Sequence, residues 1–447
     1  MDRLFGTDGI RGIADQHPVT MEMGTKLGRS LVRFCERRKI NPSVVIGRDT
    51  RASGKKLEDA VMSGVISAGG QVKLAGVLST PGVAFLTRTL GGGAGVVLSA
   101  SHNPHEYNGF KVFSNDGFKL SEDEEIEIEA MIFNETGSSS GVDMEHVEVL
   151  ENVNDSYISF LLNTIPEQTR LQDIKPIIDC ANGATFQVAP NLFKRLGINT
   201  KAIFVESDGK NINRDCGSQH TETLSGMVFE TGADLGLAFD GDGDRLIAVD
   251  EKGGVLTGDQ ILMICAKMLL ERGDLKNNIL VSTVMSNMGL GAALRDLGVK
   301  HVITPVGDRH VVEEMRKQGG ILGGEDSGHI VFLDHHTTGD GILSALQLLC
   351  AISMLGQPLS GLSGLMTIYP QTLINVSVKK KLDIFRVPEL AQVIHDVADK
   401  LGDEGRVLVR YSGTEPLCRV MVEGKRQKEI EEYSRRIADV ITKLLNA

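Results

Sequence analysis

The feature that most limits the fold of this chain is an alternation of strand-like and helix-like segments that starts again twice along its length. In the first round, the apolar runs SVVIGRD, QVKLAGV and AGVVLSA read as strands separated by helical segments. A polar stretch, Glu135 to Val142, ends this round, and a second round begins with a helix near Val153 to Leu162. A third begins near Thr257. We therefore expect an α/β protein with three similar α/β domains that contain mixed sheets.

Residues 367–447 follow a different order: strand, helix, strand, strand, helix. The last helix places apolar residues on one face: Ile430, Tyr433, Ile437, Ile441 and Leu444. This pattern predicts a smaller C-terminal α+β domain. A chain of 447 residues is also too long for one hydrophobic core. The expected domains are residues 1–152, 153–254, 255–366 and 367–447.

A candidate catalytic residue, Ser101, follows the third strand-like run in the segment GVVLSASHNPHEYNGFKVF. The pair Asn103-Pro104 prevents either a strand or a helix from continuing there. Open α/β sheets bind ligands at the carboxyl ends of their strands, and Ser101 lies at such an end. On this segment alone, a serine that only caps a turn remains an alternative.

A second motif, AFDGDGDRLIAVD, alternates the carboxylates of Asp240, Asp242 and Asp244 with glycines, which lets the three side chains converge. Several oxygen ligands at this density suit Mg²⁺. An EF-hand loop does not fit, because its sixth position requires glycine and here holds Arg245, and because strand signals flank the loop. An acidic surface turn without a metal is the other alternative.

Three carboxylates repel a phosphate group, so a phosphorylated serine beside them requires a cation and basic side chains. Several basic residues lie in glycine-bearing loops: Arg11, Arg48, Arg51, Lys111 and Arg245. The turn GGEDSGH offers Glu325, Ser327 and His329, which suit hydrogen bonds to sugar hydroxyls, although Asp-Ser-Gly is also a common plain turn.

A fourth motif, VLVRYSGTEPLCRVMVEG, places a polar turn between two strand signals in the last domain. Backbone N–H groups and two guanidinium groups make it a candidate anion cradle, formed by Arg410, Ser412, Gly413, Thr414 and Arg419; a plain hairpin turn is the alternative. A hydrolase needs one phosphate site, whereas a mutase must hold its substrate by either end. Two phosphate sites on one chain therefore favour a mutase that acts on a phosphosugar.

The formal net charge of −12, without a dense Lys/Arg patch, argues against nucleic acid as a partner. No uninterrupted apolar stretch is long enough to span a bilayer, and the segment MDRLFGTDGIRG has no signal-peptide core. The six cysteines form no CxxC pair and are expected to be reduced and mostly buried. We expect a cytoplasmic protein that has no membrane partner.

With SASHNP, DGDGDR, GEDSGH and RYSGTEP in this order, the sequence resembles the α-D-phosphohexomutase superfamily over essentially its whole length. FGTDGIRG and TTGDGI make it most similar to the bacterial branch that acts on glucosamine phosphates, although Asp326 stands where most of that branch carries Gln. The resemblance implies four domains around a central cleft. It also implies phosphate on Ser101, and Mg²⁺ held by that phosphate, Asp240, Asp242 and Asp244.

The implied reaction interconverts glucosamine 6-phosphate and glucosamine 1-phosphate through glucosamine 1,6-bisphosphate, for UDP-N-acetylglucosamine and cell-wall precursor synthesis. Glucosamine or glucose 1,6-bisphosphate is the implied activator, Arg11 and Lys111 assist proton transfer, and relatives suggest a homodimer. Arg245 and the GEDSGH residues would bind the sugar phosphate, and the C-terminal cradle would bind the phosphate that is not reacting. The alternatives are a phosphoglucomutase or phosphomannomutase of the same superfamily, and a non-catalytic phosphosugar-binding protein.

Overall fold

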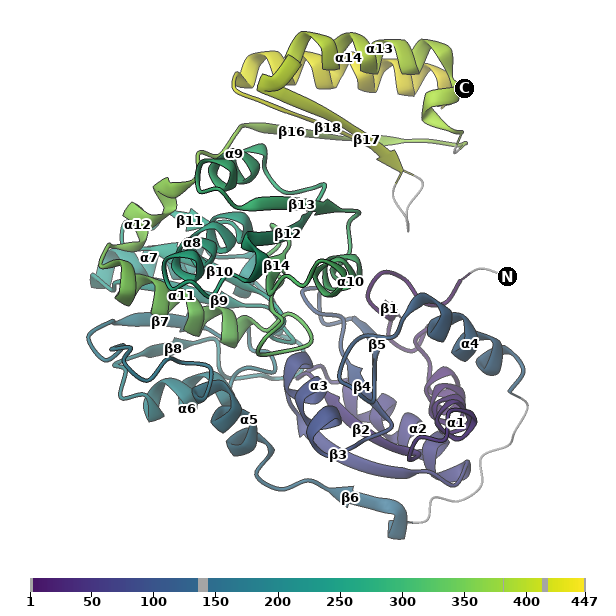
Figure 1. The fold of residues 1–447 in the computed structure, drawn as a ribbon. Helices are drawn as coiled ribbons and strands as arrows, with labels where there is room; N and C mark the ends of the chain where they lie inside the picture. Colours follow the sequence, from purple (N-terminus) through teal and green to yellow (C-terminus); the bar gives the residue numbers. More distant parts are fainter. Residues whose placement is uncertain (1–2, 136–143, 381, 412–416, 446–447) are drawn as a thin grey trace. The chain divides into compact units, whose positions relative to one another are not determined.

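The computed structural model describes residues 3–135, 144–380, 382–411 and 417–445 (Figure 1). The chain divides into two compact units. The first comprises Met1–Ser286 with Leu297–Leu365, and the second comprises Asn287–Asp296 with Met366–Ala447.

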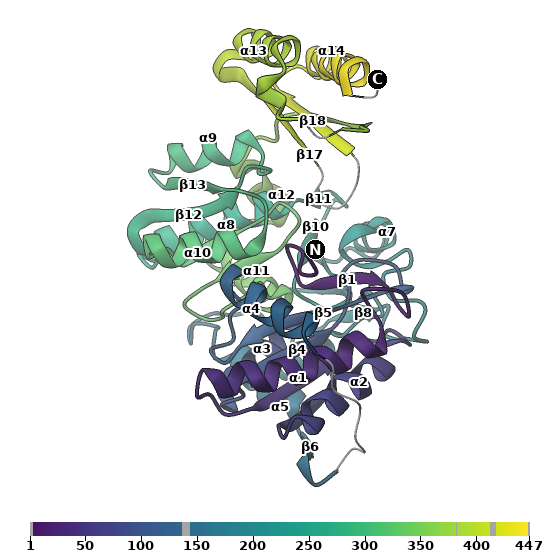
Figure 2. The ribbon, with the colours of Figure 1, turned by 90° about the vertical axis from the view of Figure 1, so that its right-hand side faces the viewer.

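The first sheet has the strand order β1-β5-β4-β2-β3-β6. β2 pairs in parallel with β3 and β4, whereas β5 runs antiparallel to β4 and β1. β2 and β4 are almost fully buried and apolar, as expected for central strands covered on both faces. α1 and α2 lie side by side over one face (Figure 2), and α3 packs on β2 and β4. The elements are β1 (Ile10–Ile13), α1 (Met21–Arg37), β2 (Ser43–Arg48), α2 (Gly54–Ser67), β3 (Gln71–Val77), α3 (Thr80–Thr89), β4 (Ala94–Leu98), β5 (Tyr107–Ser114), α4 (Glu122–Phe133) and β6 (Val147–Val149).

The second sheet has the order β11-β10-β9-β7-β8. β9 and β10 form an antiparallel hairpin in which Phe239 pairs with Leu246, so residues 240–245 are its turn. Both strands are wholly buried, which fixes this turn at the edge of a packed core. The elements are α5 (Val153–Leu162), β7 (Pro176–Asp179), α6 (Val188–Arg195), β8 (Lys201–Ile203), α7 (Glu222–Thr231), β9 (Leu235–Phe239), β10 (Leu246–Asp250) and β11 (Val255–Leu256).

The third sheet has the order β13-β12-β14-β15. β14 and β15 form another antiparallel hairpin, in which Gly324 pairs with Ile330 and residues 325–329 make the turn. The elements are α8 (Gly258–Glu271), β12 (Ile279–Thr283), α9 (Met288–Asp296), β13 (Lys300–Thr304), α10 (Asp308–Gln318), β14 (Leu322–Gly324), β15 (Ile330–Phe332), α11 (Gly341–Leu355) and α12 (Leu359–Leu362).

The second compact unit is a three-stranded antiparallel sheet, β16-β18-β17, with α13 and α14 on one face (Figure 1). Its apolar core joins both helices to the sheet. α9, which follows β12 in the chain, belongs to this unit, and the Met288 N–H donates to Glu423 Oε1 at 2.8 Å. The elements are β16 (Gln371–Ser377), α13 (Pro388–Leu401), β17 (Gly405–Tyr411), β18 (Leu417–Gly424) and α14 (Gln427–Leu445).

The predicted fold class is confirmed: three α/β segments with mixed sheets precede a smaller α+β segment. The six cysteines are buried and free, as expected. In the part of the chain that the structure describes, no single helix is long and apolar enough to cross a membrane. Only α11 taken together with residues 359–365 has the length and apolar composition of a membrane span, and this pair is bent by 90°.

Candidate active site

Ser101 lies in the turn that follows β4, and its backbone has a left-handed conformation with φ of 52°. This conformation is uncommon for a residue with a side chain and needs support from its surroundings. One support is local: the Ser101 N–H donates to Ser99 Oγ at 2.9 Å, and Ser99 Oγ donates to Asp49 Oδ2 at 2.6 Å. Ser101 is fully buried, so the turn presents its hydroxyl to the protein interior.

Arg51 and Asn213 hold the same turn from outside. The Arg51 guanidinium is fully buried, pairs with Asp49 at 2.8 Å and donates to the carbonyl oxygens of Ser101, Asn103, Pro104 and Tyr107. Asn213 Nδ2 donates to the carbonyl oxygens of Ser101 and Asn103 at 2.8 and 3.0 Å. Arg51, which the sequence offered as a partner for phosphate, therefore uses its donors to shape the turn.

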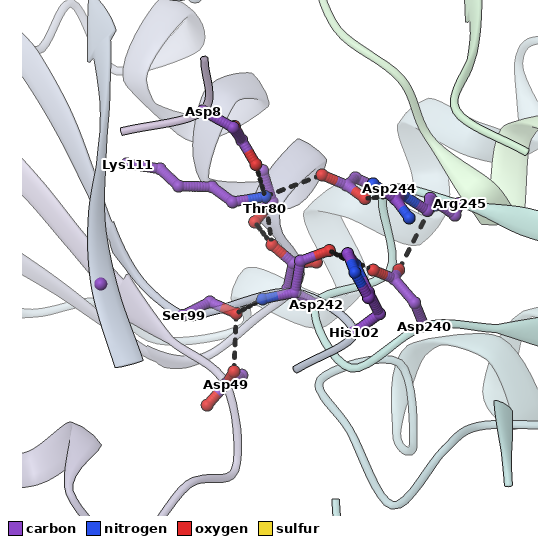
Figure 3. Close-up of polar contacts among 12 residues, drawn as sticks. Asp8, Asp49, Thr80, Ser99, His102, Lys111, Asp240, Asp242, Asp244 and Arg245 are labelled. Carbon is purple, nitrogen blue, oxygen red and sulfur yellow. Dashed lines mark hydrogen bonds and ion pairs between the residues drawn. The ribbon is translucent and has the colours of Figure 1, made fainter. Parts of the chain in front are cut away.

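The carboxylates of Asp240, Asp242 and Asp244 converge in the β9–β10 turn, and one oxygen of each lies within 4.8 Å of the others (Figure 3). All three residues are buried, and Ser101 Oγ donates to Asp240 Oδ2 at 2.6 Å. The strands that flank this turn also exclude the EF-hand alternative.

This carboxylate cluster fits a divalent cation. Among the described residues, Oδ1 of Asp242 and Oδ1 of Asp244 are buried without a hydrogen-bond partner, which is costly unless a cation takes their lone pairs. Burial, with Asp244 and Asp242 beside it, raises the pKa of Asp240 well above its usual value. A cation bound among the three would favour the ionised form instead.

Lys111, on β5, brings positive charge to the same cluster. Its Nζ lies 2.7 Å from Asp242 Oδ2, 2.8 Å from Asp244 Oδ2 and 3.0 Å from Asp8 Oδ2. Burial alone would lower the pKa of Lys111, but these carboxylates outweigh burial and hold it well above its usual value. Arg11, on β1, pairs with Asp8, and its pKa is likewise raised by carboxylates although burial opposes this. Both side chains are therefore cationic at the site.

Two further side chains complete the surroundings of Ser101. Arg245 Nε lies 3.9 Å from Asp244 Oδ1, and the Arg245 backbone N–H donates to Asp240 Oδ1 at 3.3 Å. His102 Nδ1 lies 3.3 Å from Ser101 Oγ. Burial, together with the positive charges of Arg245 and Arg11, lowers the pKa of His102 to about 4, so this imidazole is neutral at pH 7.

The β14–β15 turn brings one of its predicted residues to the aspartates. His329 Nδ1 lies 3.7 Å from Asp244 Oδ2, and its Nε2 lies 3.2 Å from Asp308 Oδ2. Burial opposes the charged form, but Asp308 and Asp244 raise the pKa of His329 to about 10. Glu325 Oε1 accepts from the Gly307 N–H at 3.1 Å, and Ser327 Oγ is buried without a hydrogen-bond partner among the described residues.

The predicted C-terminal cradle lies in the second compact unit. Arg410 and Arg419 face each other across the β17–β18 pair. Burial, and to a lesser degree the positive charge of Arg419, lowers the pKa of Arg410. Ser412, Gly413 and Thr414 lie outside the described residues.

Sequence-family models match almost the whole chain. They are the phosphoglucomutase/phosphomannomutase alpha/beta/alpha domains I, II and III, over residues 2–138, 155–254 and 257–369, and the C-terminal domain of the same family, over residues 373–440. The chain belongs to the phosphoglucomutase/phosphomannomutase family. The predicted superfamily is thereby confirmed.

Relatives within this family are similar over their full length. The chain is 51% identical to the phosphoglucosamine mutase of Syntrophus aciditrophicus, and the match covers 99% of each chain. It is 50% identical to the phosphoglucosamine mutase of Syntrophobacter fumaroxidans, with the same coverage. The resemblance to the glucosamine phosphate branch is thus also confirmed.

Solved structures of the family have the same fold. A phosphoglucomutase/phosphomannomutase family protein from Burkholderia thailandensis aligns with a TM-score of 0.82 and 26% identity, covering 99% of this chain and 98% of that one. N-acetylphosphoglucosamine mutase from Aspergillus fumigatus, in complex with GlcNAc-6P and magnesium, aligns with a TM-score of 0.67 and 17% identity, covering 98% and 95%. At 17% identity, the second match supports the fold alone.

Within the first compact unit of this family member, the structure brings together Ser101, the three aspartates, Arg11, Lys111, Arg245 and His329. Sequence reasoning missed the residues that support them: Asp8, Asp49, Thr80, Ser99, Lys119, Asn213 and Asp308. Asp8 and Asp49 lie in the FGTDGIRG and GRDTRASG loops whose arginines were noted, so charge balance was the available signal.

Proposed function

We propose that this protein is a phosphoglucosamine mutase that interconverts glucosamine 6-phosphate and glucosamine 1-phosphate through phosphoserine at Ser101. The observation that carries this proposal is the Ser101 hydroxyl, 2.6 Å from Asp240, beside three buried carboxylates, the buried cation Lys111 and the partly buried cation Arg11. The choice of an amino sugar follows from about half identity, over the full length, to phosphoglucosamine mutases.

The reaction is a pair of opposite phosphoryl transfers. In the first, the bond between phosphorus and Ser101 Oγ breaks and a bond to O1 of glucosamine 6-phosphate forms, while the hydroxyl proton of O1 passes in net terms to Ser101. The product, glucosamine 1,6-bisphosphate, turns around. In the second, the phosphorus–O6 bond breaks and a bond between phosphorus and Ser101 Oγ forms, while the Ser101 hydroxyl proton passes in net terms to O6. Free glucosamine 1-phosphate then leaves and the phosphorylated enzyme is restored.

The side chains around Ser101 match the demands of phosphoryl transfer, which depends mainly on positioning and on stabilising negative charge. A Mg²⁺ ion held by Asp240, Asp242, Asp244 and the phosphoserine would supply charge neutralisation on the transferring group. Lys111 and Arg11 are cationic, so their N–H groups can donate hydrogen bonds to the phosphoryl oxygens and to the sugar hydroxyl, but neither side chain can accept a proton. His102 is neutral and lies beside Ser101 Oγ, which makes it a candidate proton acceptor.

The remaining predicted residues hold the rest of the substrate. Glu325, Ser327 and His329 bind sugar hydroxyls, and Arg245 adds positive charge near the serine. Arg410, Ser412, Gly413, Thr414 and Arg419 bind the phosphate that is not reacting. Because the bisphosphate must be bound in both orientations, this cradle has to accept either phosphate. Glucosamine or glucose 1,6-bisphosphate activates the protein by phosphorylating Ser101.

A phosphoglucomutase or phosphomannomutase of the same family is the second candidate, since the solved Burkholderia thailandensis relative is described at that broader level. The test is the kcat/KM of purified protein, with Mg²⁺ and bisphosphate, on glucosamine 6-phosphate, glucose 6-phosphate and mannose 6-phosphate. We expect a clear preference for the amino sugar. A preference for glucose 6-phosphate or mannose 6-phosphate contradicts the proposed substrate. Absence of activity on all three sugars supports the alternative of a non-catalytic phosphosugar-binding protein.

The same proposal includes the domain boundaries, the cellular location, the oligomeric state and the use of the product. The chain divides into domains at residues 1–152, 153–254, 255–366 and 367–447. The protein acts in the cytoplasm as a homodimer, and its product supplies UDP-N-acetylglucosamine and cell-wall precursor synthesis. The phosphosugar is its small-molecule partner.

A further inference from the structure

Beside the aspartates, six charged side chains form a closed ring in which acidic and basic groups alternate. The ring runs through Lys111, Asp8, Lys119, Asp308, His329 and Asp244, which contacts Lys111 again. Its contacts include 3.0 Å from Lys111 to Asp8, 3.2 Å from His329 to Asp308 and 2.8 Å from Lys111 to Asp244. The most exposed member, Asp8, has 20% of its side chain accessible, and the others have 12% or less.

Lys119 and Asp308, like Asp8, have no role in the proposed phosphoryl transfer. Lys119 follows β5 and ion-pairs with both Asp8 and Asp308. Asp308 is the first residue of α10, where the helix N-terminus favours a negative charge. The two residues lie 189 positions apart in the chain and join the segment around β5 to the third sheet region.

Stability alone is a weak reason for such a pair, because removing charges from water costs several kcal/mol per ion and well-packed apolar residues often stabilise as much. The contacts of the pair instead bear on the orientation of Lys111 and His329, which lie beside the aspartates. Lys119 pairs with Asp8 Oδ1, which leaves Asp8 Oδ2 for Lys111 and Arg11. Asp308 and the Gly339 N–H both contact His329 Nε2, which leaves Nδ1 facing Asp244.

We propose that Lys119 and Asp308 are a positioning pair that holds Lys111 and His329 against the aspartate loop. This inference rests on the proposed function, since it concerns the same phosphoryl transfer. The pair acts through other residues and does not itself touch the reacting atoms. Its loss therefore lowers the rate of transfer more than it weakens binding of the sugar phosphate.

The test compares Lys119→Met, Asp308→Asn and the double variant Lys119→Met/Asp308→Asn. Each single variant leaves a buried charge with fewer partners, so both Tm and kcat should fall. The double variant removes both charges and should recover most of the Tm. Its kcat should stay about 10- to 100-fold below that of the wild type, as for other residues that orient catalytic groups. KM for glucosamine 6-phosphate should change by about threefold or less.

A matched control is Lys276→Met, which breaks an exposed Lys–Asp pair of 2.8 Å with Asp334. This variant should leave kcat, KM and Tm nearly unchanged. Wild-type kcat in the double variant overturns the proposal. If the double variant does not fold, the test uses Asp308→Asn, which keeps the size of the side chain. A folded Asp308→Asn protein with wild-type kcat also overturns the proposal. A wild type that prefers another hexose phosphate contradicts the proposed substrate only, and the same ratios are then measured with that sugar.

Discussion

At the scale of single residues, the geometry of Ser101 is imposed by its neighbours. A left-handed serine turn is unfavourable by itself, and here Arg51 and Asn213 bind the carbonyl oxygens on either side of the bend. Asn213 also has positive φ and comes from the segment after β8, far from Ser101 in the chain. The hydroxyl direction toward Asp240 therefore depends on two separate regions of the chain.

We predict that Asn213→Ala lowers stability by about 1–3 kcal/mol, because two carbonyl oxygens lose a donor. It should also slow phosphorylation of Ser101 by bisphosphate, measured by intact mass against time. Asn154→Ala, which removes an exposed 2.9 Å bond to Gln187, is the control and should change neither quantity. A normal phosphorylation rate in a folded Asn213→Ala protein would show that the clamp is not needed.

His336 gives the fold a dependence on pH. Its Nε2 donates to the Pro81 carbonyl at 2.9 Å and its Nδ1 accepts from the Thr337 N–H at 2.8 Å, so only the neutral ring satisfies both contacts. Burial lowers the pKa of His336 from 6.5 to about 3. Below pH 6.5, His336 is protonated in the unfolded chain but stays neutral in the folded protein. The free energy of unfolding therefore falls as the pH decreases toward 3.

The expected loss from His336 is up to about 4 kcal/mol of unfolding free energy between pH 6.5 and 3. His336→Gln, which does not titrate, should flatten this part of the profile although it is less stable at pH 7. Denaturant unfolding at a series of pH values measures both proteins. Equal slopes in the two proteins would assign the pH dependence to other groups.

At the scale of elements, Ser101, the three aspartates and His329 lie in the turn after β4 and in the turns of two β-hairpins, whereas Lys111 and Arg11 lie on β5 and β1. These elements were predictable because their signals are local: apolar runs make the strands, and Gly, Asn and Pro mark the turns. The supporting contacts were not predictable in the same way. Arg51 reaches Ser101 across 50 positions, and Lys119 reaches Asp308 across 189, so neither pairing leaves a periodic pattern.

Local patterns also misassigned side chains. Arg51 looked like a phosphate ligand because charge in a glycine-bearing loop is typical of such sites, but its environment is made of carbonyl oxygens contributed by another segment.

The β9–β10 turn predicts that a divalent cation stabilises the folded protein. Mg²⁺ at about one hundred times its Kd should add about 2.7 kcal/mol, seen as a higher Tm. Asp242→Asn should lose most of this increase, because it removes one ligand charge from the cluster. Lys276→Met serves as a control that keeps the increase. A Tm that is the same with Mg²⁺ and with chelator in the wild type would count against a metal site.

At the scale of the whole molecule, the residues proposed for the reaction are distributed over both compact units: Ser101 belongs to one and the Arg410–Arg419 pair to the other. The order of the four motifs in the chain indicated this distribution, since each predicted segment carries one of the motifs. The membership of α9 in the second unit had no sequence signal, because its apolar pattern continues the third α/β round.

We predict that Arg410→Ala raises KM for glucosamine 6-phosphate about 10- to 100-fold, as expected for losing charge-assisted hydrogen bonds to phosphate. Ser101 should still be phosphorylated by excess bisphosphate. Arg386→Ala, which alters an arginine with 87% of its side chain exposed in the same unit, is the matched control. An unchanged KM in Arg410→Ala would remove this residue from the substrate site.

The most direct test of phosphoryl transfer through Ser101 is the intact mass of the purified protein after incubation with glucosamine 1,6-bisphosphate and Mg²⁺. We expect a gain of one phosphoryl group in the wild type, none in Ser101→Ala, and loss of the group again when glucosamine 6-phosphate is added. A wild type that never gains the group, or a Ser101→Ala variant that does, would contradict phosphoryl transfer through Ser101.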